Sequence, residues 1–247
     1  MISEEIDLQD FVSEYYANVR YKNKYSLMYH EALLSVAISL IKNDGLILDN
    51  GCGVGNLFEH SPNKNIIGID ISEGMLNKAK SRMVYVVRGD TEKLPFKNLS
   101  FDSVICKALL HHVHNKEVAI REMERVLRDG GELIVVEPIK TILSAMPRKM
   151  VKESKHFSTI HSNFKRDELI KLFGDRFDIK SVIYNGYIAH PLLGFPDVID
   201  LHKYIPFKDH SVPILMRIDN FISKLPIINK QSWTIILRLT KKGGQEN

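Results

Sequence analysis

The feature that most limits the fold of this chain is an alternation of two sequence patterns between residues 45 and 137. Short β-branched and aliphatic runs predict five strands, at Leu46–Leu48, Ile66–Ile69, Val84–Val87, Phe101–Cys106 and Glu132–Val136. Between these runs, helical patterns occur at Asn56–His60, Ser72–Arg82 and Glu117–Leu127. Nearly continuous apolar strands that alternate with helices predict a parallel sheet covered on both faces. Ligands of such sheets bind at the carboxyl ends of the strands.

The segments on either side of this block extend the same architecture. Two amphipathic patterns, Leu8–Tyr16 and Tyr25–Ile41, predict a helical cover within residues 1–43, ahead of a core over 44–138. Later runs at Phe177–Tyr187 and Trp233–Leu239 predict two more strands. Residues 139–164 and 188–225 are expected to be insertions that form a lid on the substrate side. We therefore predict one α/β domain over 1–247, a Rossmann-like, doubly wound sandwich.

Composition narrows the class of protein. The 247 residues are 44% hydrophobic and carry 34 Lys and Arg against 30 Asp and Glu, as in ordinary globular domains. The two cysteines, Cys52 and Cys106, exclude a disulfide framework and a four-thiolate zinc site. The acidic start does not resemble a signal peptide, and the longest apolar stretch, Ala32–Ile41, is too short to cross a bilayer. We therefore expect a cytoplasmic protein.

A glycine-rich turn follows the first predicted strand, in the segment Asp49-Asn50-Gly51-Cys52-Gly53-Val54-Gly55. Its glycines allow unusual backbone angles and the close approach of a ligand. One residue separates successive glycines, unlike the dinucleotide pattern, and no Lys-Ser or Lys-Thr follows to bind a nucleoside triphosphate. An acid two residues before the first glycine suits a ligand that bears a cation better than it suits a pyrophosphate.

Acidic residues also follow the next two predicted strands. Asp70 ends the second strand, where a carboxylate can accept both hydroxyls of a ribose. Ser72 is placed to cap the following helix, with Met75 one turn inside it. Asp90, followed by Thr91, comes after the third strand, where an acid can accept from an adenine amino group.

Six motifs in this order resemble those of the class I S-adenosylmethionine-dependent methyltransferases, in particular the small-molecule branch: LDNGCGVG, GIDIS, GD, LPF, FDSVICKALLHHV and RVLRDGGELIVVEP. The resemblance covers roughly residues 30–138. It implies seven strands with the last one antiparallel, and Trp233–Leu239 is the candidate for that strand, beside Phe177–Tyr187. It also implies S-adenosylmethionine as the cofactor and S-adenosylhomocysteine as the product.

The resemblance further implies roles for individual residues. The methionine part of the cofactor would be lined by Asp49, Gly51, Cys52, Gly53 and Gly55, with the backbone of Lys107. The ribose would be held by Asp70 and the adenine by Asp90 and Thr91, and Ile71 and Met75 would complete the site. The N-terminal helical cover would place Tyr16, Tyr21 and Tyr25 on the substrate side.

The methyl acceptor stays open at this point. After the fourth predicted strand the chain has Lys107-Ala108-Leu109-Leu110, not the Asp/Asn-Pro-Pro-Tyr tetrad of enzymes that methylate base amines or glutamine side chains. We expect methyl transfer to an O, N or C nucleophile of a small molecule. The alternatives are a methyltransferase for a macromolecule, such as tRNA or a protein, and a non-catalytic relative that binds the cofactor.

Histidines near the strand ends are candidates for a general base. A hydroxyl nucleophile would gain from a base whose pKa lies near neutrality, and histidine is the usual choice. His111 and His112, just past the fourth strand, are the first candidates, and His156 and His161 are expected on the substrate side of the lid. Histidines clustered without cysteine or acid ligands more often pack or line a substrate site, so no metal site is predicted.

Two basic segments bear on possible partners. The cations within Arg148–Lys155 indicate contact with an anionic substrate, a phosphate-rich surface, or only solvent. Without a basic tail, nucleic acid is not expected as a partner. Between 188 and 225, apolar residues lie among Lys203, Lys208, Arg217 and Lys224, which would suit peripheral contact with a membrane, although such helices more often pack on the sheet.

Overall fold

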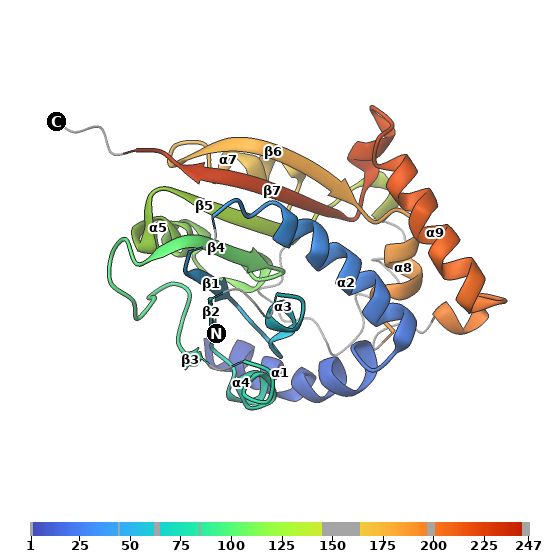
Figure 1. The fold of residues 1–247 in the computed structure, drawn as a ribbon, viewed down its shortest axis with the longest axis horizontal. Coiled ribbons are helices and arrows are strands. Elements are labelled where there is room, and N and C mark those ends of the chain that lie inside the picture. Colours follow the sequence, from blue (N-terminus) through green and yellow to red (C-terminus); the bar gives the residue numbers. More distant parts are fainter. Residues whose placement is uncertain are drawn as a thin grey trace.

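A seven-stranded sheet forms the centre of the computed structural model, which describes residues 2–43, 45–61, 65–83, 85–144, 164–196 and 201–243. The strand order is β3-β2-β1-β4-β5-β7-β6 (Figure 1). The strands are β1 (Ile47–Asn50), β2 (Ile66–Asp70), β3 (Val86–Arg88), β4 (Phe101–Lys107), β5 (Leu127–Pro138), β6 (Phe177–Asn185) and β7 (Thr234–Lys241).

The directions of the strands confirm the predicted topology. Strands β3, β2, β1, β4 and β5 are parallel neighbours, and β7 lies antiparallel between β5 and β6. The chain moves outward from β1 to β3 and then returns to place β4 on the other side of β1. Such a reversal is a topological switch point, where the loops after neighbouring strands diverge and leave room for a ligand.

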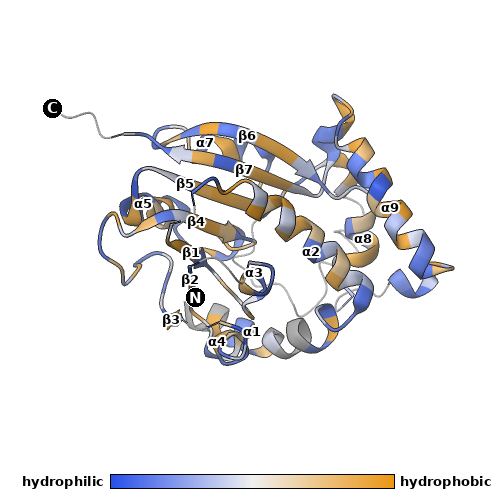
Figure 2. Cartoon of the chain, in the orientation of Figure 1, coloured by the Kyte–Doolittle hydropathy of each residue, from blue (hydrophilic) through white to orange (hydrophobic). Residues whose placement is uncertain are grey.

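Helices cover both faces of this sheet, as predicted. The helices that pack on it are α2 (Lys24–Ser39), α3 (Asn56–Glu59), α4 (Glu73–Ala79), α5 (Lys116–Val126) and α7 (Arg166–Lys171). Buried side chains of α5 and α7 share one core with Leu48 of β1, while those of α2, α3 and α4 share another with Ile47. Because neighbouring residues of β1 enter different cores, the strand is apolar on both sides, as Figure 2 shows for the central strands.

Strand β5 begins earlier than its sequence pattern predicts. Leu127 already pairs with Phe101 of β4, and pairing resumes at Glu132 with Ser103 after a shift of register. Gly130 lies between these points with a φ of +70°. The Asp-Gly-Gly segment therefore forms an irregularity inside the strand, of the kind a β-bulge produces, rather than a turn ahead of it.

Further helices extend beyond the sandwich at both ends of the chain. Helix α1 (Ile2–Tyr15) and the π-helix η1 (Tyr16–Arg20) precede α2, and α1 packs along α4 (Figure 1). After β6 come α8 (Ala189–Leu193), η3 (Leu201–Tyr204), α9 (Lys208–Ile222) and η4 (Ile228–Gln231). Within the described ranges, none of the helices combines the length and the apolar character that crossing a membrane requires.

Helix α9 is held against the rest of the molecule by one buried carboxylate. Asp219 accepts from the backbone N–H groups of Tyr187, Ile188 and Ala189 at 2.9, 2.8 and 3.1 Å. The helix starts at Lys208 and contains Pro213. A buried acid that accepts three backbone donors is a strong anchor, so one face of α9 is fixed toward α8 and the end of β6.

Candidate functional site

A glycine turn joins β1 to α3 at the switch point. Gly51 and Gly53 have φ angles of +77° and +53°, which residues with a side chain rarely adopt. The N–H groups of Gly51 and Cys52 donate to the carbonyl of Ile69 in β2, at 2.8 and 2.9 Å, so the turn is fixed to the sheet. A Cβ on Gly51 would meet Leu109 at 3.0 Å, whereas a Cβ on Gly53 would have open space around it. A ligand could therefore approach the bare backbone at Gly53.

Asp70, at the end of β2, connects this turn to the next helix. Its Oδ2 accepts from the N–H of Gly53 and its Oδ1 from the N–H of Ser72, each at 2.9 Å. Ser72 caps α4 by accepting from the N–H of Met75 at 3.0 Å. Burial raises the pKa of Asp70, although the backbone donors oppose this shift. Each carboxylate oxygen has two lone pairs, so the group can accept two more donors, such as vicinal hydroxyls.

Asp49, at the end of β1, is a buried carboxylate that accepts no hydrogen bond from any residue in the described ranges. The residue is only 4% exposed. Burial raises its pKa to about 7, against the opposing charge of Lys107 and with a further contribution from Asp70. A buried acid without donors is costly unless a ligand supplies them. A cationic group bound beside Asp49 would remove much of that cost.

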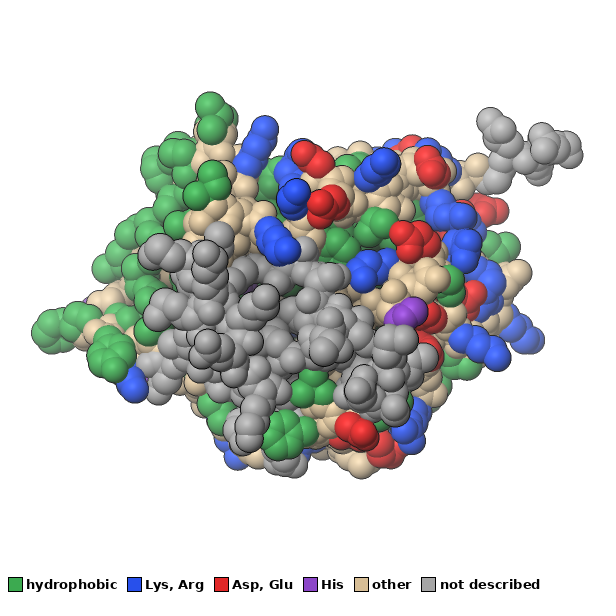
Figure 3. All heavy atoms as spheres, turned by 180° about the vertical axis from the view of Figure 1, so that it is seen from behind, with side chains coloured by type: hydrophobic (Ala, Val, Ile, Leu, Met, Phe, Trp, Pro, Cys, Tyr) green, Lys and Arg blue, Asp and Glu red, His purple; other side chains and the backbone are tan. Residues whose placement is uncertain are grey.

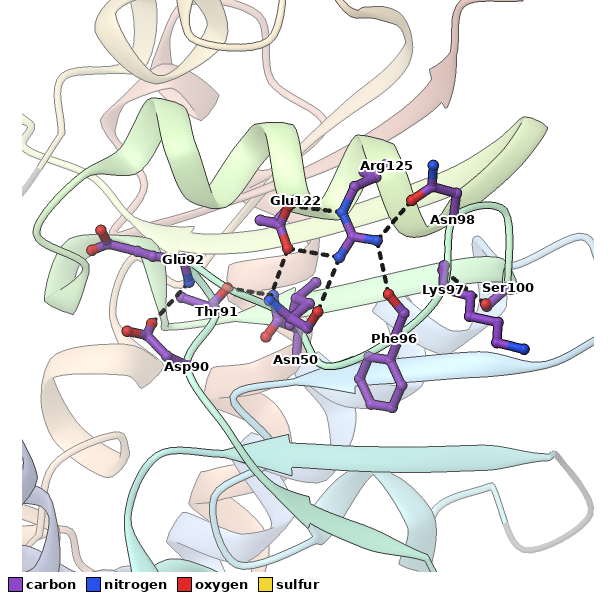
Figure 4. Close-up of polar contacts among 11 residues, drawn as sticks. Asn50, Asp90, Thr91, Glu92, Phe96, Lys97, Asn98, Ser100, Glu122 and Arg125 are labelled. Atoms are coloured by element: carbon purple, nitrogen blue, oxygen red, sulfur yellow. Dashed lines mark hydrogen bonds and ion pairs between the residues drawn. The ribbon is translucent and has the colours of Figure 1, made fainter.

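The loop after β3 carries the third predicted acid, Asp90, whose Oδ1 accepts from the N–H of Glu92 at 2.8 Å (Figure 4). The neighbouring Thr91 is bonded to Asn50, the last residue of β1, whose Nδ2 donates to Thr91 Oγ1 at 2.7 Å. Thr91 was predicted to contact the ligand, and no role was predicted for Asn50. Asn50 is almost fully buried, and a buried amide needs hydrogen-bond partners. The signal for this contact in the sequence was an amide among the otherwise apolar and acidic residues at the end of the strand.

An ion pair on α5 fixes the same loop from its other side. Nη2 of Arg125 lies 2.7 Å from Oε2 of Glu122, and the same oxygen accepts from the N–H of Leu94 at 2.8 Å. Arg125 donates to the carbonyls of Leu94 and Phe96 at 2.9 and 2.8 Å (Figure 4). These bonds hold the backbone that follows Asp90, so the position of that acid depends on α5.

Helix α1 is docked beside Asp70, on the first turn of α4. Asp10 accepts from the Oγ of Ser72 and from the N–H of Gly74, the latter at 2.8 Å. Beneath this contact lies a small apolar cluster of Leu8, Tyr21, Val54 and Met75. The predicted N-terminal cover therefore lies over α4 and the glycine turn, and Met75 is enclosed within that contact.

The residues predicted to lie on the substrate side are placed differently from one another. Tyr21 lies edge-on to His30, with ring centroids 5.5 Å apart. Tyr25 faces α9 instead, where its hydroxyl donates to Asp209 at 3.3 Å. Tyr16 belongs to η1, but its side chain lies outside the described residues, as do His156, His161 and the segment Arg148–Lys155. The structure thus places Tyr21 near the glycine turn and Tyr25 in the contact between α2 and α9.

A buried histidine and glutamate meet at the ends of β4 and β5. His111, in the short helix η2 (Leu110–His112), has its Nδ1 2.6 Å from Oε2 of Glu137. Glu137 is fully buried, and its Oε1 accepts from the N–H groups of Leu109 and Leu110 at 2.9 and 2.8 Å. Burial raises the pKa of Glu137. The ring of His112 lies against that of His111, with centroids 4.2 Å apart. The carboxylate fixes the orientation of the imidazole.

A second group of buried rings, which the sequence analysis missed, comes from α2 and α8. The hydroxyl of Tyr29 lies 2.6 Å from Nδ1 of His190, and His30 Nε2 donates to the carbonyl of Gly194 at 3.1 Å. The guanidinium of Arg20 lies over the ring of Phe195, 5.5 Å from its centroid. The helical spacing of Tyr29 and His30 with Leu33 and Leu34 was the signal that these polar rings face inward.

Burial and nearby charges keep His30 neutral. Burial holds the pKa of His30 well below its usual value, and the nearby charges of Lys107 and Arg20 lower it further. Lys107, the last residue of β4, thus lies within electrostatic reach of both Asp49 and His30. Tyr21, which lies edge-on to His30 and packs with Val54 of the glycine turn, connects the ring group to the strand ends.

The remaining predicted residues have ordinary surroundings. The carbonyl of Ile71 accepts from Nε of Arg88 at 3.3 Å. Cys52 and Cys106 are buried free thiols. No three His, Cys, Asp or Glu side chains are arranged to hold a metal ion in the part of the chain that the structure describes.

Comparison with known proteins identifies the family. A methyltransferase-domain model matches residues 48–135, and an uncharacterized protein of Methanocaldococcus jannaschii is 32% identical over 187 residues, 69% of this chain and 72% of that protein. An S-adenosylmethionine-dependent methyltransferase of Thermotoga maritima has the same fold, with a TM-score of 0.69 and 23% identity over 96% of this chain and 99% of that one. The chain belongs to the class I S-adenosylmethionine-dependent methyltransferases. The predicted family, cofactor and fold are thereby confirmed.

The family does not fix the acceptor. The ubiquinone/menaquinone biosynthesis C-methyltransferase of Pseudomonas fluorescens is 35% identical over 116 residues, 42% of this chain and 45% of that enzyme. Other relatives carry names that refer to tRNA or to a malonyl-[acyl-carrier protein]. The chain spans 41–45% of the length of the first curated relatives that it matches.

The cofactor of this family, S-adenosylmethionine, fits the residues at the switch point. The open space at Gly53 leaves room for a ligand against the backbone. Asp49 is a buried acid without a donor, as the ammonium group of a methionine moiety requires. Asp70 retains the capacity to accept two hydroxyl donors. One acid is thus present for the ammonium group of the ligand and another for its ribose hydroxyls.

Proposed function

We propose that this protein transfers the methyl group of S-adenosylmethionine to a small-molecule acceptor. The observation that carries this proposal is a group of ring side chains around the cation of Arg20, drawn from η1, the turn after it, α2 and the segment after β6: Arg20, Tyr21, Tyr29, His30, His190 and Phe195. Side chains that close over a site from several segments favour a compact ligand. A macromolecule such as tRNA would need an open basic face.

The strand-end acids would bind the cofactor. Asp70 would accept the ribose hydroxyls, Asp90 the adenine amino group, and Asp49 would lie beside the ammonium of the methionine part, next to the backbone of Gly53. When bound, the cofactor supplies an electrophilic methyl group on a positively charged sulfur. The contribution of the chain is then to orient the acceptor and to exclude water.

His111 is the group that we propose takes a proton from a hydroxyl acceptor. Donation from its Nδ1 to Glu137 makes Nε2 the basic nitrogen. The proton that the acceptor loses passes to Nε2, and the buried carboxylate of Glu137 stabilises the resulting imidazolium. His112, which packs against His111, is the alternative position for this role.

Calorimetric titration with S-adenosylmethionine, with NADH as the control ligand, tests the first half of the proposal. Saturable binding of S-adenosylmethionine alone is expected. Release of S-adenosylhomocysteine is then measured with a panel of small acceptors, with total tRNA and with a protein extract. Turnover only with tRNA or protein would overturn the small-molecule assignment, and binding without turnover on any acceptor would favour a non-catalytic relative.

The base is tested with His111→Ala and His112→Ala. If His111 takes the proton, its loss lowers turnover by about 10²–10⁴-fold while cofactor affinity stays near that of the wild type. A loss confined to His112→Ala would move the role to that residue. Equal losses of turnover and cofactor affinity would assign both rings to packing.

A further inference from the structure

The face of α9 that points away from the sheet is unusually apolar. Of the 15 exposed large apolar side chains among the described residues, seven lie between 204 and 228: Tyr204, Phe207, Ile214, Ile218, Phe221, Ile227 and Ile228. Phe207 and Phe221 are 85% and 63% exposed. In the space-filling view, hydrophobic side chains gather along the edge of the molecule that α9 occupies (Figure 3). Scattered exposed apolar residues are normal, but a contiguous group marks an interaction site.

Four of these side chains form one stripe along α9. Ile214, Ile218 and Phe221 are spaced by four and three residues, which places them on one side of α9, and Phe207 immediately precedes the helix. The opposite side is already used, because Val212 and Asp219 are buried there. The apolar stripe, defined by these four residues, is therefore left largely exposed when α9 packs on its own domain.

Basic residues are frequent in the segment that carries the apolar stripe. Between 201 and 230 the chain has five cations, Lys203, Lys208, Arg217, Lys224 and Lys230, and two acids, Asp209 and Asp219, a difference of +3. Asp219 is buried beneath the helix, and Asp209 is paired with Lys24 at 2.5 Å. Neither acid therefore offsets the positive charge that borders the stripe.

We propose that this face of α9 binds the surface of an anionic lipid bilayer. Apolar side chains on one side of a helix, bordered by Lys and Arg, are the arrangement that lies in the interfacial plane of a membrane. Anionic lipids attract the basic border, and the aromatic and aliphatic side chains enter the acyl boundary. Two copies of the chain facing one another here would bring like charges together, which disfavours a dimer through this face. The proposal does not depend on methyl transfer.

Flotation with phospholipid vesicles tests this inference on the full chain. We expect binding to phosphatidylcholine vesicles that contain about 30% phosphatidylglycerol, much weaker binding to phosphatidylcholine alone, and a decrease with added salt. Replacing both Arg217 and Lys224 by glutamine should weaken vesicle binding roughly 25-fold, about fivefold for each cation. Replacing both Phe207 and Phe221 by serine should weaken it by about tenfold or more.

Matched controls test whether the loss of vesicle binding is specific to the apolar stripe or follows from any loss of charge or apolar surface. Lys97→Gln with Lys180→Gln removes two exposed cations elsewhere, and Tyr85→Ser with Ile179→Ser removes two exposed apolar side chains elsewhere. Both should bind vesicles as the wild type does, with unchanged circular dichroism in all variants. No binding to anionic vesicles, or equal losses in the controls, would overturn the proposal. So would a wild-type dimer in sedimentation that the two serine substitutions dissociate, since the stripe would then bind a second copy.

Discussion

Replacing Asp49 by asparagine separates the effect of this buried acid on stability from its contribution to cofactor binding. Burial raises the pKa of Asp49 from 3.8 to about 7. At about 1.4 kcal/mol per pKa unit, the ionised carboxylate destabilises the folded protein by at most about 4 kcal/mol. The folded protein holds this proton more tightly than the unfolded chain, so the wild type loses stability as the pH rises from about 4 to about 7. The amide does not ionise. We expect Asp49→Asn to be about 2–4 kcal/mol more stable than the wild type at about pH 8, and equally stable near pH 4.

The free energies of unfolding are measured by urea titration of both proteins without cofactor, at about pH 4 and about pH 8. Calorimetric titration with S-adenosylmethionine follows at the higher pH, where the variant should bind more weakly because its amide offers no negative charge to an ammonium group. Equal stability of the two proteins at both pH values would refute the description of Asp49 as a buried acid without donors. A more stable variant with unchanged affinity would refute its place beside the methionine part.

Three further substitutions test the other contacts of the site. Asp70→Asn should weaken cofactor binding about 10–150-fold, or about 1.5–3 kcal/mol, because the charged acceptor is lost, as measured by calorimetry. Glu137→Gln should lower turnover about 10–100-fold and shift the pH profile of kcat/KM, with little change in cofactor affinity, because His111 loses its charged partner. Asp10→Ala should lower the free energy of unfolding by about 1–3 kcal/mol in urea titration, because two donors of α4 lose their acceptor.

The predictions for Asp70 and Glu137 can each be contradicted by a specific result. Glu73→Gln, on the half-exposed face of α4, is the matched control for Asp70 and Asp10, and it should leave both affinity and stability near the wild type. An Asp70 variant that binds no more weakly than this control would exclude the carboxylate from the cofactor site. A Glu137 variant with an unaltered pH profile would show that the buried pair only supports the packing of η2.

The sheet could be predicted because its strands are covered on both faces. The central strands β4 and β5 carry the apolar runs Val104–Cys106 and Leu133–Val136, which stand out from the helices between them. Prediction was weaker for β3, an edge strand of only three residues, Val86–Arg88, which pairs with β2 alone.

The candidate site likewise has parts that the sequence pattern predicts and parts that it does not. Asp49, Asp70 and the glycine turn lie at strand ends, so their place at the switch point follows from the alternation of strands and helices alone. The pairs His111–Glu137 and Asn50–Thr91 join residues 26 and 41 positions apart. Such pairs depend on how the loops after neighbouring strands approach one another, which the pattern of a single strand does not contain.

This division explains why the cofactor could be predicted more readily than the acceptor. The acids proposed to bind the cofactor come from consecutive strand ends between β1 and β3, so one stretch of sequence carries the whole pattern. The ring group comes from α2 and α8, whose contact between Tyr29 and His190 joins residues 161 positions apart. Side chains that line an acceptor pocket from separate segments can change without disturbing the glycine turn. Family members can therefore share one cofactor site and differ in acceptor, as the names of this chain's relatives do.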